Sequence, residues 1–170
     1  GSSSGEYVSD VNWTEAANKS TETYIKYFFE NAGGRNTFAG EIYWEKPNTP
    51  ETGEPVSTGG SGGWSQGHAL DIVTDAYVRH ADNSEYQTYL YENIMKPFLP
   101  AFDEWNRTCG YGGNDFWNNF YDDMEWMALA CLRVYELTGD QDYYSALMKM
   151  WDHIKGAKND YKGVGGMAWK

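Results

Sequence analysis

The spacing of apolar side chains constrains the fold most, because it recurs at three and four residues in five segments. The clearest segment runs from about Asp122 to Leu137, where Trp126, Ala130 and Val134 continue one stripe and Gly139 follows as a terminator. This spacing is typical of α-helices, and no strand-like alternation competes with it. The chain is therefore predicted to be all-α.

Four more helices follow from the same spacing. The helix expected at 84–95 should stop near Pro97 and Pro100, because proline lacks the N–H that a helix needs. Two segments of the sequence that lie 58 residues apart resemble each other, which indicates repeated helical hairpins. Asp82 in the first segment and Asp140 in the second are each expected to cap the helix that follows. The remaining helices are expected at about 12–30, 65–80 and 142–155.

A long loop is expected between the first two helices, from about residue 31 to 63. Loops of this length inside a compact domain are usually functional or mobile. The aromatic residues Phe38, Tyr43 and Trp44 favour a binding loop over a linker.

The charge balance excludes several classes of partner. With 13 Lys and Arg against 25 Asp and Glu, the net charge of −12 makes nucleic acid and anionic membranes poor partners. No apolar run approaches the roughly 18 residues of a membrane span. Aromatic residues make up 17% of a chain whose mean hydropathy is −0.71. Their rings suit stacking on sugars or, alternatively, an aromatic core.

The sequence contains no metal-binding pattern. There is no CxxC or HExxH motif, and the three histidines are scattered, so neither a metal nor a cofactor is predicted. Cys131 lies in an apolar helical stretch and is expected to be a buried free thiol. Residues 1–11 form a predicted flexible leader or tag remnant.

Two adjacent carboxylates, Asp122 and Asp123, stand where the strongest helix should begin. Asp122 as N-cap with Glu125 three residues later would form a capping box, which is the structural interpretation. A cap does not need the amides and aromatic rings that crowd this point. These are Trp117, Asn118, Asn119, Tyr121 and Trp126.

A carboxylate pair is what glycoside cleavage requires. Retaining enzymes hold the two carboxyl groups about 5–5.5 Å apart and inverting enzymes about 6.5–9.5 Å. Neighbouring Cα atoms are about 3.8 Å apart, so adjacent aspartates reach the short separation most easily. The helix N-terminus would stabilise one carboxylate as the anion, while like-charge repulsion would keep the other protonated.

Several motifs together resemble glycoside hydrolase family 76, a family of endo-α-1,6-mannanases with an (α/α)6 toroid fold. The resemblance begins at about Trp64 and implies retention, with Asp122 as nucleophile and Asp123 as acid/base. It also implies no cofactor, and mannan or mannooligosaccharide as the partner. The motifs are WNNFYDD (117–123), WMALA (126–130), YELTGD (135–140) and GGMAW (165–169).

Candidate substrate-binding residues come from two sources. The resemblance places the GGMAW segment beside the cleft, which makes Gly165, Gly166 and Trp169 wall residues. Position near the carboxylate pair adds Trp64, Asn118, Asn119 and Tyr121. For Trp64 and Trp126, a place in the core is an alternative to sugar contact.

A complete toroid needs twelve helices, whereas five are expected in these 170 residues. Residues 12–170 are therefore interpreted as about half of the domain, incomplete at the C-terminus. In such a half domain the first helix, with Trp13, Ala17, Tyr24 and Phe28, is expected to expose an apolar stripe. A second chain or a missing segment would complete the toroid and cover that stripe.

The leading hypothesis is a retaining endo-α-1,6-mannanase in an extracytoplasmic location: secreted, periplasmic or surface-tethered. A fragment of this length could itself be inactive. One alternative is a transglycosylase of the same fold, in which a sugar hydroxyl replaces water. Others are a non-catalytic helical glycan-binding protein and a purely structural helical-repeat module.

Overall fold

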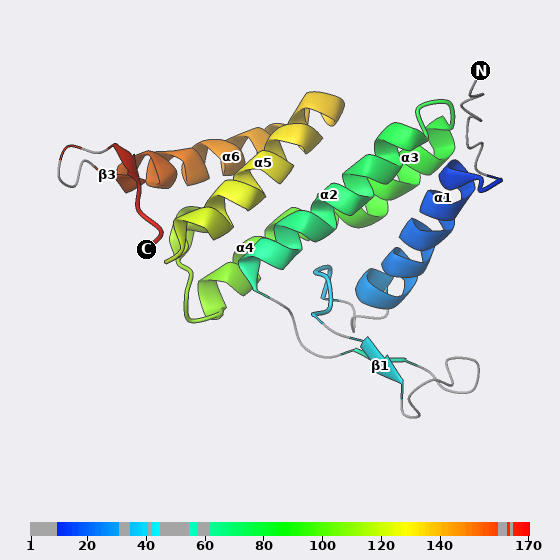
Figure 1. Cartoon of the computed structure of the whole chain (residues 1–170), viewed down its shortest axis with the longest axis horizontal. Helices are drawn as coiled ribbons and strands as arrows, with labels where there is room; N and C mark the ends of the chain where they lie inside the picture. The colour runs from blue at the N-terminus through cyan, green and yellow to red at the C-terminus, as the bar shows by residue number, and fades with distance from the viewer. Residues whose placement is uncertain are drawn as a thin grey trace, which may run out of the picture.

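The computed structural model describes residues 10–30, 35–40, 42–44, 55–57, 62–159, 163 and 165–170. Five helical rods dominate the described part of the chain (Figure 1). The predicted all-α class is therefore confirmed. Most of the predicted leader, residues 1–9, lies outside the described residues.

The first rod is α1, Trp13–Tyr24, which continues as a π-helical turn, Ile25–Glu30. It begins where predicted because the Asn12 side chain accepts a hydrogen bond from the N–H of Glu15 at 3.1 Å. Of its expected open stripe, Trp13 is exposed, while Tyr24 and Phe28 are partly buried and stack on each other.

Helices α2, Gly63–Arg79, and α5, Tyr121–Thr138, pack side by side. Their close approach depends on Gly67, where a Cβ would lie 3.3 Å from the backbone of Met127. Helix α5 ends at Gly139, whose φ of 72° is the left-handed conformation that the sequence predicted for a terminator.

The predicted stop at Pro97 is wrong. Helix α3, Ser84–Leu90, runs through a π-helical segment, Tyr91–Met95, into α4, Lys96–Thr108. Pro97 falls in the first turn of α4, where a missing N–H costs little. Pro100 lies inside α4, and the burial of Phe98, Leu99 and Phe102 on the same helix offsets the hydrogen bond that it removes.

The last long helix is α6, Gln141–Ile154, followed by a 3₁₀ turn, Lys155–Ala157. Asp140 caps α6 as predicted, accepting from the N–H of Asp142 at 2.8 Å. The matching prediction for Asp82 is wrong, because the neighbouring Asn83 caps α3 instead.

Short antiparallel strand pairs interrupt the helices. Strand β1, Ile42–Trp44, pairs with β2, Pro55–Ser57, inside the segment predicted as a loop. Strand β3, Lys158–Asn159, pairs with β4, Gly166–Met167. Phe38 belongs to the core rather than to a binding loop, since it is 1% exposed. The side chains of Tyr43 and Trp44 lie outside what the structure describes.

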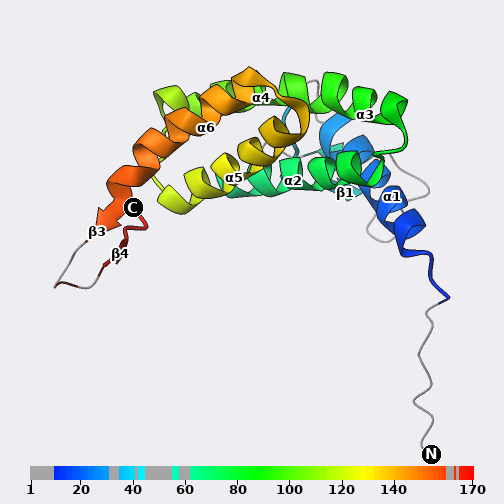
Figure 2. The ribbon, with the colours of Figure 1, turned by 90° about the horizontal axis from the view of Figure 1, so that it is seen from above.

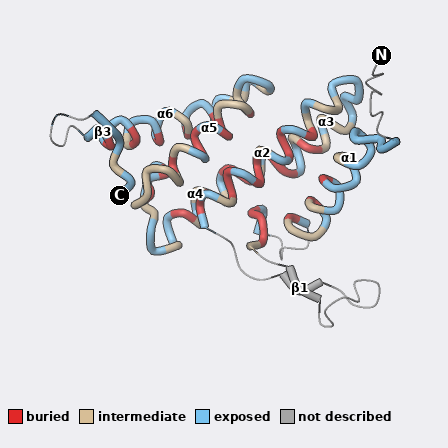
Figure 3. The backbone as a smooth tube through the Cα atoms, viewed as in Figure 1, coloured by how far each residue is buried: buried red, intermediate tan, exposed pale blue. Residues whose placement is uncertain are grey.

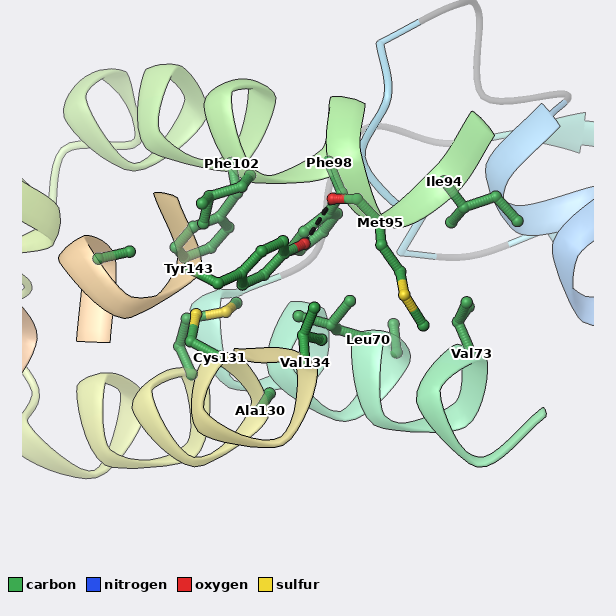
Figure 4. Close-up of a cluster of buried hydrophobic side chains, with 14 of the residues drawn as sticks. Leu70, Val73, Ile94, Met95, Phe98, Phe102, Ala130, Cys131, Val134 and Tyr143 are labelled. Carbon is green, nitrogen blue, oxygen red and sulfur yellow. Dashed lines mark hydrogen bonds between the residues drawn. The ribbon is translucent and has the colours of Figure 1, made fainter. Parts of the chain in front are cut away.

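The helices form two layers, with α2 and α5 in one and α3, α4 and α6 in the other (Figure 2). Buried and exposed positions alternate along each helix, as amphipathic helices require (Figure 3). The core lies between the layers, where Leu70 and Val134 meet Phe98 and Tyr143 (Figure 4). The Tyr143 hydroxyl donates to the carbonyl of Met95, so the one polar atom of this buried ring is satisfied.

The two cysteines are free thiols, and Cys131 is fully buried, as expected from its apolar surroundings in the sequence. Burial raises the pKa of the Cys131 thiol, so this cysteine is an inert part of the core. Among the described residues, no helix is both long enough and apolar enough to cross a membrane.

Candidate active site

The start of α5 is not built as a capping box. The helix begins at Tyr121, its N-cap residue is Phe120, and no side chain caps it. Asp122 lies inside the first turn, where its Oδ1 accepts from the N–H of Asp123 at 2.9 Å. The structural interpretation, with Asp122 as cap and Glu125 as its partner, is therefore wrong. Both aspartates remain partly exposed at a helix N-terminus.

Both carboxylates face one cleft of about 770 Å³. The cleft forms because α2 and α5 begin, and α4 ends, at the same end of the molecule (Figure 1). Tryptophan, tyrosine and phenylalanine rings supply much of its wall. The lining residues are Gly62, Gly63, Trp64, Trp105, Cys109, Tyr111, Asn118, Phe120, Asp122, Asp123, Trp126 and Trp169.

Asp123 lies between the N-termini of α2 and α5. Burial, and secondarily the negative charge of Asp122, raise the pKa of the Asp123 carboxyl, against a hydrogen bond from the Trp64 N–H that lowers it. A Cβ at Gly63 would lie 3.2 Å from Oδ2 of Asp123, so the first residue of α2 must be small for the carboxylate to keep this place.

Asp122 has a different set of neighbours. Its Oδ2 accepts a hydrogen bond from Nε1 of Trp169 at 3.0 Å. The C-terminal residues lie beside the start of α5 in two views (Figures 1 and 2). One carboxylate of the pair is thus held by an indole and the other by a backbone N–H of α2.

A buried amide pair holds the loop before α5 in place. Nδ2 of Asn118 donates to Oδ1 of Asn106 at 3.2 Å, and Oδ1 of Asn118 accepts from the Phe120 N–H at 2.9 Å. Nδ2 of Asn106 in turn donates to the Trp117 carbonyl at 2.8 Å. A Cβ at Gly112 would lie 2.1 Å from the Asn106 carbonyl oxygen, so this position requires glycine.

The same loop stores backbone strain. Asp115 and Phe116 both have positive φ, at 55° and 61°; aspartate tolerates this left-handed conformation, whereas a bulky aromatic residue rarely adopts it. Phe116 keeps this conformation because its ring is buried beside Phe102. Strain of this kind concentrates at functional sites, where the surroundings determine the backbone.

The structure brings together five of the nine predicted site residues. Asp122, Asp123, Trp64, Asn118 and Trp169 line the cleft. Trp64 is 52% exposed and Trp126 is 37% exposed, so the alternative of a core position is wrong for both.

The other four predicted site residues are not among the residues that line the cleft. The Asn119 N–H donates to the Tyr111 carbonyl at 2.7 Å, and the ring of Tyr121 packs against the core. Gly165 and Gly166 are exposed, and Gly166 pairs with β3.

Sequence reasoning missed several wall residues. Trp105 and Cys109, at the end of α4, precede the aspartate pair by more than ten residues, and only the tertiary fold brings them to it. Tyr111 and Phe120 pack together, with ring centroids 5.9 Å apart. Phe120 directly precedes Tyr121 in the crowded motif and could have been included on that ground. Among the described residues, no group of three or more metal-binding side chains could hold an ion.

Proteins of known structure resemble this chain in sequence and in fold. No protein-family model and no curated protein matches the chain. Among solved structures, it is similar to the GH76A α-1,6-mannanase from Salegentibacter sp. HEL1_6, with 31% identity and a TM-score of 0.68. The match covers 94% of this chain and 38% of that one.

Two further matches are variants of the same mannanase, described as inactive. In each, two adjacent aspartates are replaced, by alanine or by asparagine, and the complexes contain α-1,6-mannotetrose or α-1,6-mannotriose. Both are 27% identical to this chain, with TM-scores of 0.67 and 0.66. They cover 94% of this chain and 39% or 38% of the matched chain.

The Lin0763 protein from Listeria innocua is also similar, at 27% identity and a TM-score of 0.62, over 94% of this chain and 40% of that one. The chain thus spans about two fifths of the length of the structures it matches. This coverage is consistent with an N-terminal half, and the helical hairpins form part of an (α/α)6 toroid. The resemblance to glycoside hydrolase family 76 that the motifs indicated is therefore confirmed, in sequence identity and in fold, by the α-1,6-mannanases of that family.

Proposed function

We propose that the chain carries the catalytic carboxylates of a retaining endo-α-1,6-mannanase, with Asp122 as nucleophile and Asp123 as acid/base. The observation that carries this proposal is that two adjacent carboxylates in one cleft wall have different surroundings. Asp122 is held by N–H donors at a helix N-terminus, whereas burial raises the pKa of Asp123. A nucleophile must be ionised and an acid must keep its proton, so this asymmetry suits the two roles.

The related structures support the same assignment. In the Salegentibacter mannanase, the variants described as inactive carry changes at two adjacent aspartates, and their complexes contain α-1,6-linked mannose oligomers. Asp122 and Asp123 are an adjacent pair in this chain. The aromatic walls of the cleft, among them Trp64 and Trp126, offer flat faces to sugar rings.

The reaction proceeds in two steps. A carboxylate oxygen of Asp122 bonds to the anomeric carbon while the glycosidic bond breaks, and Asp123 donates its proton to the departing oxygen. Water then attacks the same carbon, gives a proton to Asp123 and releases Asp122. Each step inverts the anomeric centre, so the product retains its configuration. A sugar hydroxyl in place of water gives transglycosylation by the same residues.

The chain spans about two fifths of its structural relatives, so the proposal includes a second chain or further segment that completes the toroid and the cleft. Mannan is a polymer too large to cross a membrane unaided. The proposal accordingly places the protein outside the cytoplasm, in secreted, periplasmic or surface-tethered form.

The test uses the complete protein, in which the segment or second chain that closes the toroid accompanies this chain, in three forms: the parent, Asp122→Asn, and Asp82→Asn as a control at an exposed turn away from the cleft. Reducing-sugar release from α-1,6-mannan measures turnover, and calorimetry with mannotetraose measures binding. We expect Asp122→Asn to lower turnover by about a thousandfold or more, because the covalent step is lost. Binding should survive, since other residues contact the sugar, and Asp82→Asn should behave as the parent.

Each contrary result identifies a different alternative. Binding without turnover in the complete parent protein would indicate a glycan-binding protein, and no binding at all would indicate a structural module. Substantial hydrolysis by Asp122→Asn would place the nucleophile elsewhere. Products longer than the substrate would identify a transglycosylase.

A further inference from the structure

The orientation of Asp122 is set by two N–H donors, one on each oxygen. The Asp123 N–H reaches Oδ1 at 2.9 Å, and the Trp169 indole reaches Oδ2 at 3.0 Å. Within the described part of the chain, Asp122 forms no ion pair with a lysine or arginine. Neutral donors fix the direction of the carboxylate without neutralising its charge.

Trp169 is itself attached to the start of α5 at more than one point. Its carbonyl accepts the N–H of Tyr121 at 3.0 Å, which satisfies one of the donors that a helix N-terminus leaves unpaired. Its ring packs against Phe120 with centroids 5.3 Å apart, and Lys170 Nζ lies 5.3 Å from the same Phe120 ring. The neighbouring Ala168 N–H donates to the Ala157 carbonyl at 2.7 Å.

These contacts, rather than burial, determine where the indole lies. Trp169 is 64% exposed, so no apolar core holds the ring at this position. Backbone and side chain of one residue both bind the first turn of α5, and the indole N–H can therefore point steadily at Asp122. Asp123 takes its own donor, the backbone N–H of Trp64, so the two carboxylates do not compete for one N–H.

From this geometry we propose that Trp169 is a positioning residue, which holds the Asp122 carboxylate in its attacking orientation through the indole N–H. The inference rests on the proposed function, because it assigns Trp169 a role toward the nucleophile. It goes beyond a place in the cleft wall, since a wall residue contacts the sugar and affects binding. A positioning residue affects the covalent step, where a small misplacement of the attacking oxygen lowers the rate.

The key variant is Trp169→Phe, which keeps an aromatic ring beside Phe120 and removes the N–H donor together with the five-membered ring that carries it. Trp151→Phe is the matched control, because Trp151 lies on α6 and is 51% exposed. The contact can be observed directly by ¹H–¹⁵N NMR of the 8 tryptophan indoles. The indole signal that is lost in Trp169→Phe is assigned to Trp169. Asp122→Ala, which removes the acceptor, should shift that signal, and Asp82→Ala should leave it in place.

The kinetic arm separates positioning from sugar binding. We expect Trp169→Phe to lower kcat by roughly 10- to 100-fold with KM within about twofold of the parent value. Labelling of Asp122 by a fluoromannoside that traps the covalent intermediate, followed by mass spectrometry, should slow by the same factor. Trp151→Phe should change neither, and the melting temperature of Trp169→Phe should match that of its control.

Three results would overturn the inference. If the chemical shift of the Trp169 indole does not change in Asp122→Ala, the contact does not exist in solution. A rise in KM at unchanged kcat shows that Trp169 serves only as a sugar-stacking wall. Identical kinetics in Trp169→Phe and Trp151→Phe show no role at all. A complete parent protein, with the segment that closes the toroid present, that binds mannooligosaccharide without turnover contradicts the proposed function instead, and the indole shift then decides the contact by itself.

Discussion

The two ends of α5 use aspartate in opposite ways. At the C-terminal end, Asp140 is fully engaged: Oδ1 caps α6 through the Asp142 N–H at 2.8 Å, and Oδ2 accepts the Tyr91 hydroxyl at 2.7 Å. That hydrogen bond is the main reason why the pKa of Tyr91 rises to about 12. At the N-terminal end, neither Asp122 nor Asp123 is the N-cap residue, and both face a cleft.

The difference separates stability from chemistry within one helix. Side chains that satisfy helix ends hold the turn together, and their loss destabilises the fold. The ionised Asp123 carboxylate, which is partly buried and lies beside the charge of Asp122, opposes folding, and such arrangements persist at sites that use them. The end of α5 whose aspartate caps the next helix is therefore the structural end, and the end whose two carboxylates face the cleft is the candidate for catalysis.

Asp140→Ala should have the largest effect on stability. It removes a helix cap worth about 1 kcal/mol and a tyrosine hydrogen bond worth about 1 kcal/mol, for a loss of roughly 2 kcal/mol. Chemical unfolding measures this loss. Turnover of the folded protein should stay near the parent value, the reverse of what Asp122→Asn does.

The matched control is Asp82→Ala, in the turn between α2 and α3, where Asn83 does the capping. It should change the free energy of unfolding by less than about 0.5 kcal/mol, as for surface substitutions generally. Equal destabilisation by Asp82→Ala and Asp140→Ala would show that the capping difference between the two turns is unimportant.

The helices were predictable because their signals are local. Apolar spacing and the glycine after α5 act within a few residues, and Gly139 marked a real helix end. The helix through Pro97 and Pro100 was missed because a π-helical segment precedes it and the core packing of its aromatic residues outweighs proline's cost. Such packing depends on partners distant in the sequence.

The site was predictable only in its centre. Asn118 and Phe120 line the cleft, whereas Asn119, a bend residue whose N–H donates to the Tyr111 carbonyl, does not. Closeness in sequence to the carboxylates therefore could not select the wall residues. Trp105 and Tyr111 reach the cleft from the end of α4 and the loop after it, and no local pattern marks that encounter.

Asp123→Asn should raise stability at pH 7. The folded protein raises the pKa of this carboxyl from its ordinary value of 3.8, chiefly by burial, so the ionised form is less favourable folded than unfolded. The ionised carboxylate therefore opposes folding at neutral pH, and the amide removes that cost. The gain in melting temperature should shrink as pH falls, and vanish below the ordinary value, where the carboxyl is protonated in both states.

Thermal unfolding of the parent and Asp123→Asn between pH 3 and pH 7 tests this dependence. Asp152→Asn is the opposite control: Lys155 lowers the pKa of this exposed carboxyl, so its substitution should not stabilise the protein at any pH. A stabilisation by Asp123→Asn that is equally large at pH 3 would show that charge is not its cause.

The smallest effect is expected from Gly62→Ser, at the start of α2. Gly62 is the N-cap and has no side chain to offer, and a serine there should add a few tenths of a kcal/mol by accepting an N–H of the first turn. If it takes the Trp64 N–H, Asp123 loses the hydrogen bond that lowers its pKa, and the pKa should rise further. An acid that keeps its proton to higher pH extends activity to higher pH, so the basic limb of the pH–rate profile should move to higher pH.

Gly62→Ala is the control, because its Cβ meets only the Trp64 ring at an ordinary 3.4 Å and brings no acceptor. A basic limb that stays in place with serine, while the protein gains stability, would show that the start of α2 does not tune the acid.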